Sequence, residues 1–165
     1  MLKPDLRVAS ITALTPELLR QQGIEAVMVD LDDTIVPSKG DSMEDVVKDW
    51  FRSLKEADFR VLILSNGQRD RVAHWARELG IPGLSLVGKP FRWAFRRGLK
   101  LLGSDPARTA MVGDQLFTDV LGANLIGVYS VLVRPLSPGK LPHTRMLRLV
   151  ERRILRSGNG EPVDR

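Results

Sequence analysis

The feature that most constrains the fold is an alternation of apolar runs with segments of helical spacing, repeated five times along the 165 residues. The apolar runs predict strands at residues 26–30, 60–65, 84–87, 109–113 and 128–133. The helices that follow the second, third and fourth runs end at a glycine, the usual residue beyond a last helical turn: Gly80, Gly103 and Gly127. Regular alternation of this kind predicts a three-layer α/β domain.

Local signals also predict a helix on either side of the first strand. Thr15 is typical of an N-cap and Pro16 of a first helical residue, in a helix that Gly23 ends. Ser42 and Asp45 resemble a capping pair, so residues 42–57 are expected to form the next helix. Its apolar residues recur at helical spacing: Val46, Val47, Trp50, Phe51 and Leu54.

Length and composition exclude several classes of protein. A chain of 165 residues suits one domain, so residues 1–157 are expected to form a single domain and residues 158–165 a frayed tail. The absence of cysteine rules out disulfides, thiolate metal sites and a thiol nucleophile. No apolar run approaches the ~20 residues of a membrane span, and no secretory signal is recognised, so a cytoplasmic protein is expected. The formal net charge of +5 favours anionic partners, namely phosphate esters, acidic lipid surfaces or nucleic acid.

Residues 27–36 read VMVDLDDTIV, an apolar strand that runs into Asp30, Asp32 and Thr34. The carboxyl end of this strand should deliver both carboxylates to the crevice in which α/β sheets bind ligands. One carboxylate can attack phosphorus and form an aspartyl-phosphate, while the other protonates the leaving oxygen and later activates water. Magnesium would hold the charge of the phosphate. Taken alone, this motif fits a solvated acidic turn equally well.

Further polar positions follow the later apolar runs in an order that favours the catalytic interpretation. VLILSN at 61–66 contains Ser65 and Asn66, LSLVG at 84–88 leads into Lys89, and AMVGD at 110–114 ends in Asp114. With Asp119 in QLFTD, this ordered set resembles the motifs of the haloacid dehalogenase-like hydrolase superfamily, over about residues 27–133. The segments LKPDL, SITALTPELLRQQGI and GDQLFTDVLGANLIGVYSVLV resemble more closely its subfamily IIIA phosphatases of the YqeG type.

The resemblance implies a Rossmann-like domain with a parallel five-stranded sheet of order 5-4-1-2-3, in which the strand at 26–30 is central. The site is then expected between the first and fourth strands, where the winding of the chain reverses. Each gap between motifs has room for one helix, so no sizeable cap domain is expected. An open crevice suits a phosphate on a large or membrane-held molecule. A homo-oligomer stays open as an alternative, because a second subunit can supply a lid.

The resemblance also implies roles for the acidic residues and the lysine. Asp30 is expected to be the nucleophile and a magnesium ligand, and Asp32 the acid and base, with its backbone carbonyl on the metal. Asp114 is expected to be the second carboxylate on magnesium, and Asp119 either orients metal-bound water or caps the following helix. Lys89 stands at an expected helix start, where positive charge is unfavourable unless an anion binds, so it is expected to neutralise the phosphoryl group.

Smaller polar residues complete the expected site. By the resemblance, Thr34 and Ser65 hydrogen-bond near the phosphate. Asn66 and Gly67 are either turn formers or donors of backbone N–H groups to an anion. Asp33 and Gly67 stand where the family more often carries Asn. Asp33 is expected to add negative charge beside the metal, and Gly67 to remove a side chain that would contact substrate.

Two basic segments have ordinary interpretations beside functional ones. In the helix expected at residues 90–102, an apolar stripe is expected to pack and a cationic stripe to be solvated: Phe91, Phe95, Leu99 and Leu102 against Arg92, Arg96 and Lys100. The stretch 143–157 mixes apolar residues with arginines. It either lies on an anionic membrane or docks on the sheet.

The function expected is a magnesium-dependent phosphatase that hydrolyses a phosphate monoester through an aspartyl-phosphate. The resemblance extends to phosphatidylglycerophosphate phosphatases of the mitochondrial type, which makes a lipid phosphate at a membrane surface the candidate substrate. A phosphatase of a soluble metabolite, a nucleotide or a phosphoprotein is the enzymatic alternative. A regulatory or nucleic-acid-binding module without turnover is the third, and the complete motifs argue against it. The protein would be cytoplasmic, or peripheral to a membrane, with no transmembrane segment.

Overall fold

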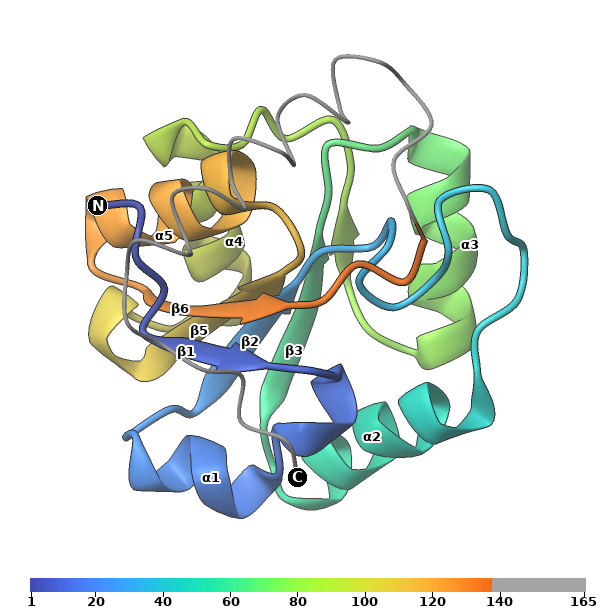
Figure 1. The fold of residues 1–165 in the computed structure, drawn as a ribbon, viewed down its shortest axis with the longest axis horizontal. Helices are drawn as coiled ribbons and strands as arrows, with labels where there is room; N and C mark the ends of the chain where they lie inside the picture. The colour runs from blue at the N-terminus through green and yellow to red at the C-terminus, as the bar shows by residue number, and fades with distance from the viewer. Residues whose placement is uncertain (138–165) are drawn as a thin grey trace.

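The computed structural model describes residues 1–137, which contain a six-stranded parallel sheet (Figure 1). The strands are β1 (Leu6–Val8), β2 (Ala26–Val29), β3 (Arg60–Leu64), β4 (Gly83–Leu84), β5 (Thr109–Gly113) and β6 (Tyr129–Val133). Their order across the sheet is β1-β6-β5-β2-β3-β4, and every neighbouring pair is parallel. β2 therefore lies inside the sheet, between β5 and β3.

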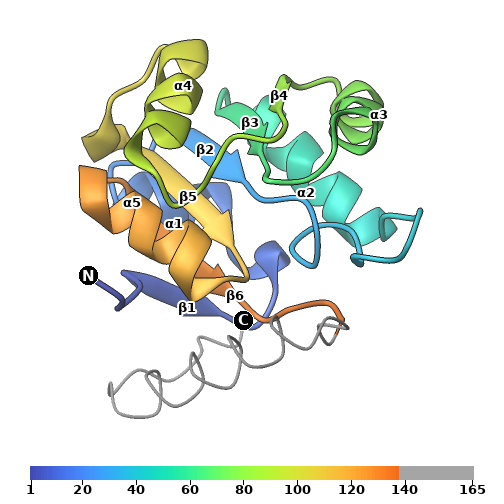
Figure 2. The same ribbon diagram turned by 90° about the horizontal axis from the view of Figure 1, so that it is seen from above.

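Helices cover both faces of this sheet, as Figure 2 shows from above. α1 (Pro16–Gln21), α2 (Asp45–Glu56) and α3 (Arg69–Leu79) pack on one face, and α4 (Arg92–Leu102) and α5 (Leu121–Ile126) on the other. Short 3₁₀ turns lie at Ile11–Ala13 and Pro106–Arg108, and a π-helical turn, Leu116–Val120, runs directly into α5. The expected three-layer α/β architecture is confirmed.

The central strand β2 is buried because its apolar side chains point alternately into two cores. Val27 and Val29 join the core beneath α2 and α3, whereas Ala26 and Met28 join the core beneath α4 and α5. A strand enclosed in this way reads as a continuous apolar run, which is why the sequence reveals it. Its carboxyl end delivers Asp30 to one edge of the sheet.

The expected sheet of five strands is wrong in number, and therefore in order. β1 is a sixth strand beside β6, with Leu6 opposite Val131 and Val8 opposite Val133. Asp5 anchors this edge, because Ser130 donates hydrogen bonds to its Oδ2 from N at 2.8 Å and from Oγ at 3.1 Å. A strand of three residues is too short for periodicity to reveal. The five expected strands keep the neighbours that the resemblance implied.

The ends of the helices follow the sequence signals in part. Thr15 caps α1, because its Oγ1 accepts a hydrogen bond from Leu18 N at 3.2 Å. The three glycines expected beyond helices all take left-handed backbone, with φ of 64°, 61° and 78°: Gly80, Gly103 and Gly127. The capping pair expected at Ser42 is wrong, since α2 begins at Asp45 and its N-cap, Glu44, makes no side-chain capping hydrogen bond.

The segment between β4 and α4 departs most from expectation. β4 is shorter than predicted because Leu86 takes a positive φ of 50°, which an extended strand does not contain. α4 begins at Arg92, so Lys89 lies in the loop that precedes the helix. The explanation of Lys89 by the positive end of a helix is therefore wrong.

The described chain has no inserted domain in the two connections that follow β2 and β3. In residues 1–137, α2 is the single helix between β2 and β3, and α3 is the single helix between β3 and β4. None of the described helices combines the length and apolar character required to cross a bilayer. The basic stretch 143–157 and the tail 158–165 lie outside the described residues.

Candidate active site

The expected site residues gather at the carboxyl edge of the sheet. Asp30 follows β2, Asp114 follows β5 and Ser65 follows β3, which are three neighbouring parallel strands. The N–H of Asp30 donates to the carbonyl of Val112 at 2.9 Å, so the pairing of β2 with β5 continues into the site. Residues far apart in the chain therefore meet where α/β sheets bind ligands.

Three buried carboxylates form the centre of the site: Asp30, Asp114 and Asp119. One oxygen from each lies within 4.8 Å of the others. The sequence predicted Asp30, Asp32 and Asp114 as metal ligands, with Asp119 in support. The carboxylate group contains Asp119 and not the side chain of Asp32, whose expected contribution was its backbone carbonyl.

Asp119 reaches this cluster from the π-helical turn before α5. Its Oδ2 accepts a hydrogen bond from Gln115 N at 3.2 Å, which holds the carboxylate against the residue that precedes the turn. Gly113, at the end of β5, makes the space that Asp119 occupies, because a Cβ there would lie 2.1 Å from Asp119 Oδ2. Any other residue at position 113 would displace the carboxylate from the cluster.

Lys89 joins two of the three carboxylates. Its Nζ lies 2.9 Å from Asp30 Oδ1 and 2.7 Å from Asp119 Oδ1, and all three side chains are buried. Burial alone would lower the pKa of Lys89, but the charges of Asp119 and Asp30 more than offset this, so its pKa is raised. The lysine is therefore a fixed ammonium ion.

The cluster brings three carboxylates close to the ammonium group of Lys89. Burial raises the pKa of Asp119 to about 7, with Lys89 opposing the shift and Asp30 adding to it. Buried carboxylates this close to one another repel, and a bound cation or an added proton relieves the repulsion. A donor set made only of carboxylate oxygens fits a hard divalent cation such as Mg²⁺, and Asp30, Asp114 and Asp119 could hold it.

Asp32 lies beside the cluster in a different environment. Its Oδ1 accepts from Nε of Arg71 at 2.8 Å, and an Nη of the same guanidinium donates to Pro37 O at 2.9 Å. Burial raises the pKa of Asp32, the hydrogen bond and charge of Arg71 lower it, and the charges of Asp30 and Asp33 raise it, with a net rise. Arg71 is absent from the sequence prediction, because nothing local to α3 signals a partner 39 positions earlier.

The smaller polar residues divide between the cluster and its supports. Thr34 Oγ1 donates to Asp114 Oδ1 at 3.3 Å, and Ser65 Oγ accepts from Gly67 N at 2.9 Å. The side chain of Asn66 hydrogen-bonds to the backbone of Gly88 and Lys89, in the loop before α4. Its Nδ2 donates to Lys89 O at 3.0 Å, and its Oδ1 accepts from Lys89 N at 2.8 Å and from Gly88 N at 3.1 Å. Asn66, predicted to bind substrate, thus uses its amide to position Lys89.

The two departures from the family pattern have structural consequences of their own. Asp33 is buried at a φ of 61°, and its Oδ1 accepts hydrogen bonds from Ser38 N at 3.0 Å and from Ser137 Oγ. Its carboxylate therefore ties together two loops. At Gly67, a Cβ would lie 3.1 Å from Asp32 Oδ2, so glycine leaves room around the carboxylate of Asp32.

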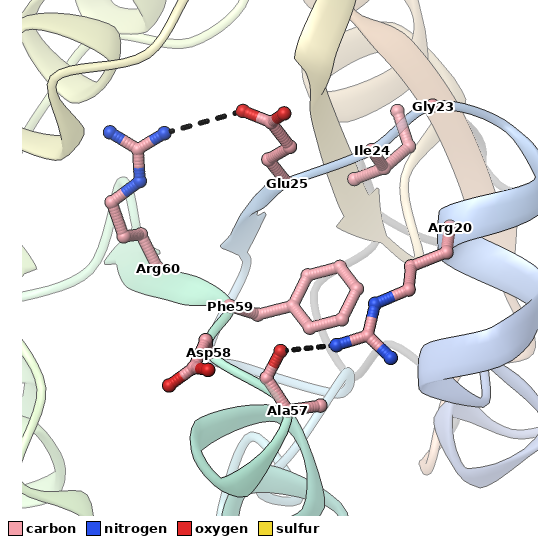
Figure 3. Close-up of a pocket in the computed structure, with 8 residues that line it drawn as sticks. All are labelled: Arg20, Gly23, Ile24, Glu25, Ala57, Asp58, Phe59 and Arg60. Atoms are coloured by element: carbon pink, nitrogen blue, oxygen red, sulfur yellow. Dashed lines mark hydrogen bonds and ion pairs between the residues drawn. The ribbon is translucent and has the colours of Figure 1, made fainter.

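A surface hollow of ≈ 390 Å³ lies at the opposite edge of the sheet (Figure 3). Glu25 and Arg60, at the starts of β2 and β3, line it and pair at 3.7 Å. Arg20 closes another side, where an Nη donates to Ala57 O at 2.5 Å. This hollow is separate from the carboxylates, because it sits at the amino ends of the strands that carry them.

The acidic cluster, its lysine and the order of their motifs along a parallel sheet define a class of hydrolase. Residues 11–127 match the sequence model of the haloacid dehalogenase-like hydrolases, and the chain belongs to this family. It is similar to the probable phosphatase YqeG of Bacillus subtilis (strain 168). The two are 36% identical over 152 residues, which are 92% of this chain and 88% of that protein.

Solved structures show the same fold. The 3-deoxy-D-manno-octulosonate 8-phosphate phosphatase of Yersinia pestis aligns with a TM-score of 0.56 and 18% identity, over 90% of this chain and 93% of that one. The corresponding phosphatase of Moraxella catarrhalis, solved with magnesium ion, phosphate ion and KDO, aligns with a TM-score of 0.51 and 20% identity, over 87% and 92%. The predicted family and the enzyme class, a phosphoric monoester hydrolase, are confirmed by the family match and the YqeG relative.

Proposed function

We propose that the protein is a magnesium-dependent phosphatase that hydrolyses a phosphate monoester through an aspartyl-phosphate. One observation carries the proposal, the buried group of Asp30, Asp114 and Asp119 with Nζ of Lys89 between two of them. A phosphate ester brings negative charge to its site, and phosphoryl transfer proceeds by positioning and neutralising that charge. Hard oxygen ligands for a divalent cation, together with an ammonium ion, can both position the phosphate and neutralise its charge.

Asp30 and Asp32 share the chemistry. In the first half of the reaction, a carboxylate oxygen of Asp30 attacks phosphorus and the bond to the leaving oxygen breaks, while protonated Asp32 gives that oxygen its proton. In the second half, Asp32 takes a proton from water, whose oxygen attacks phosphorus, and phosphate leaves as Asp30 is restored. The raised pKa of Asp32 supports this role, since the first half needs its protonated form.

The remaining residues bind and position. Asp30, Asp114 and Asp119, with the backbone carbonyl of Asp32, would hold magnesium, which supplies positive charge against the phosphoryl oxygens when bound. Lys89 adds its ammonium from a loop fixed by Asn66, and it also serves as a ligand for the substrate phosphate. The hydroxyls of two further residues are proposed to hydrogen-bond near the phosphate: Thr34 and Ser65.

The lack of an inserted domain among residues 1–137 supports a phosphate carried by a large or membrane-held molecule. Within residues 1–137, no inserted domain stands between the site and such a molecule. We therefore propose phosphatidylglycerophosphate as the substrate to test first. A soluble metabolite, a nucleotide or a phosphoprotein is the alternative, and a panel of phosphate esters separates these candidates.

The decisive measurement is phosphate release from this panel in the presence of magnesium and of other divalent ions. Asp30→Asn keeps the size of the side chain but removes the attacking oxygen, so we expect the rate to fall on the order of 10³-fold or more. Asp70→Asn, an exposed aspartate in the first turn of α3, is the matched control and should leave the rate unchanged. Turnover that persists in Asp30→Asn, or that needs no divalent ion, would refute the proposed mechanism.

A further inference from the structure

Large apolar side chains are exposed on both sides of the active-site lysine. Leu86, Phe91 and Trp93 are 64%, 56% and 56% exposed, and all three lie within four residues of Lys89. The rings of Phe91 and Trp93 are stacked, with centroids 4.4 Å apart and planes 9° from parallel. Phe91 was expected in the buried stripe of the helix, but it precedes α4 and faces solvent. Grouped apolar side chains on a surface mark a site of interaction.

The outer face of α4 continues this patch with positive charge. Trp93, Arg96, Arg97 and Lys100 follow one another at helical spacing and are exposed, and α4 contains no acidic residue. Among residues 1–137, no ion pair involves Arg96, Arg97 or Lys100. In Figure 2, α4 lies at the edge of the molecule with no described element on its outer side. The charges are therefore available to an anionic partner.

We propose that this surface docks the enzyme on an anionic lipid bilayer. The docking face consists of Leu86, Phe91, Trp93, Arg96, Arg97 and Lys100. Aromatic rings favour the level of the lipid headgroups, and basic side chains are attracted to the negative surface of anionic lipids. Exposed leucine suits acyl chains better than it suits the hydrophilic backbone of a nucleic acid. The apolar side chains at the start of α4 would enter the headgroup region, and the basic residues along its exposed face would contact the anionic surface.

The position of the docking face explains what docking achieves. Phe91 is two residues from Lys89, whose Nζ contacts Asp30. The apolar side chain of Phe91 therefore lies in the same loop as a residue of the site. Docking would hold the bilayer beside the crevice and keep a lipid phosphate within reach of the carboxylates. This inference rests on the proposed function, and it names the surface from which the substrate is presented.

Tryptophan fluorescence tests the docking face directly. The chain has three tryptophans, and Trp50 and Trp75 are each only 5% exposed. A change in emission when vesicles are added is therefore assigned to Trp93, which is exposed. With the full chain, we expect vesicles of phosphatidylserine and phosphatidylcholine to shift the emission of Trp93 to shorter wavelength. Brominated acyl chains in those vesicles should quench it. Vesicles of phosphatidylcholine alone should do neither.

Charge-neutralised variants identify the residues responsible. Each basic residue at an anionic surface contributes about fivefold to partitioning, so Arg96→Gln/Arg97→Gln/Lys100→Gln should weaken vesicle binding about 100-fold. Lys48→Gln/Arg52→Gln/Arg77→Gln removes the same charge from the helices on the opposite face of the sheet and should bind like the parent. Both variants should hydrolyse p-nitrophenyl phosphate at the parental rate, because neither touches the site. Only the α4 variant should lose activity on phosphatidylglycerophosphate in vesicles.

Several results would overturn the docking face. Vesicle binding without a change in Trp93 emission, or with equal affinity in the α4 variant, places the contact elsewhere on the chain. RNA binding or concentration-dependent dimerisation that disappears in the α4 variant, without any vesicle binding, assigns the surface to another partner. Vesicle binding without any phosphatase activity would refute the proposed function and leave the docking face standing. Activity on the soluble ester without vesicle binding would refute the docking face and leave the proposed function standing.

Discussion

The pair formed by Arg71 and Asp32 fixes both the place and the pKa of the proposed acid and base. The guanidinium is held from two sides, by Asp32 Oδ1 at 2.8 Å and by Pro37 O at 2.9 Å. It cannot move away from the carboxylate without losing the second contact. Because Arg71 lowers a pKa that burial raises, removing the arginine allows the pKa of Asp32 to rise further.

For Arg71→Gln we expect the basic limb of the pH profile of kcat/KM to move to higher pH. The sign follows from the first half of the reaction, in which Asp32 must carry a proton, so a higher pKa preserves activity in more basic solution. Arg71→Lys keeps a cation and should move the limb less, and Arg77→Gln on the same helix should leave it in place. The measurement uses a water-soluble phosphate ester at saturating magnesium. A uniform loss of rate with an unmoved limb would show that Arg71 acts on structure alone.

At this scale the sequence could predict the residues that end strands but not their partners. Asp30, Asp114 and Lys89 each follow an apolar run, so a local pattern reveals them. Arg71 and Asn66 act through contacts with loops 39 and 23 positions away, and no local signal specifies such contacts. Asn66 in particular resembles a turn residue, although its amide binds both the N–H and the carbonyl of Lys89.

At the scale of the helices, the close contact between α4 and α5 allows a test of how tightly the core is packed. Gly122 in α5 faces Phe95 in α4, and a Cβ at that glycine would lie 2.1 Å from Phe95 Cε2 and 3.1 Å from Pro90 O. Alanine favours a helix over glycine by about 1 kcal/mol, but overpacking a core costs typically 1–3 kcal/mol. With an overlap this severe, we expect Gly122→Ala to lower the free energy of unfolding by about 1–2 kcal/mol, measured by urea denaturation.

A double variant shows whether this clash is the cause. Phe95→Leu should destabilise alone, because it removes buried ring atoms. Combined with Gly122→Ala, it should cost less than the sum of the two single changes, since the smaller side chain makes room for the new methyl group. If the losses of unfolding free energy are additive, α5 shifts to accommodate the new methyl group without contacting Phe95.

The length of a strand decided how well its sequence predicted it. β3 and β5 each have five residues and stood out as apolar runs, whereas β1 has three and β4 two. The predicted β4 was too long because nothing in the sequence indicates that Leu86 adopts a positive φ. In the same loop, α4 begins at Arg92 and not at Pro90 as predicted, so Lys89 is separated from the first helical residue. Loop conformation depends on tertiary contacts such as those of Asn66, which periodicity does not contain.

At the scale of the whole molecule, the buried cluster should make stability depend on pH. The pKa of Asp119 is about 7 in the folded protein against an ordinary value of 3.8. Between these values the folded state binds a proton that the unfolded state has released, so stability is fully present at low pH and falls as pH rises through 7. We expect the metal-free protein to lose a few kcal/mol of unfolding free energy across this window, relative to Asp119→Asn. Lys89 stays charged throughout and adds no slope.

Urea denaturation in EDTA at several pH values measures this difference. The comparison with Asp119→Asn cancels the titration of the other carboxylates, which act in both proteins. Adding magnesium at neutral pH should restore stability to the parent, because a ligand that binds only the folded state stabilises it by mass action. The restoration should be smaller in Asp119→Asn. Equal pH slopes in the two proteins would show that Asp119 keeps its charge when folded.

The pairing of β1 with β6, the first and last strands of residues 1–137, has a consequence for how the molecule is made. β1 has β6 as its neighbour, and Leu6 pairs with Val131, which lies 125 positions later in the chain. Contacts between such distant positions form slowly. A nascent polypeptide that has reached Gly127 already contains every acidic residue of the active centre, but neither β6 nor a partner for β1. The sheet therefore gains the edge formed by β1 and β6 only after the acidic residues of the site have been translated.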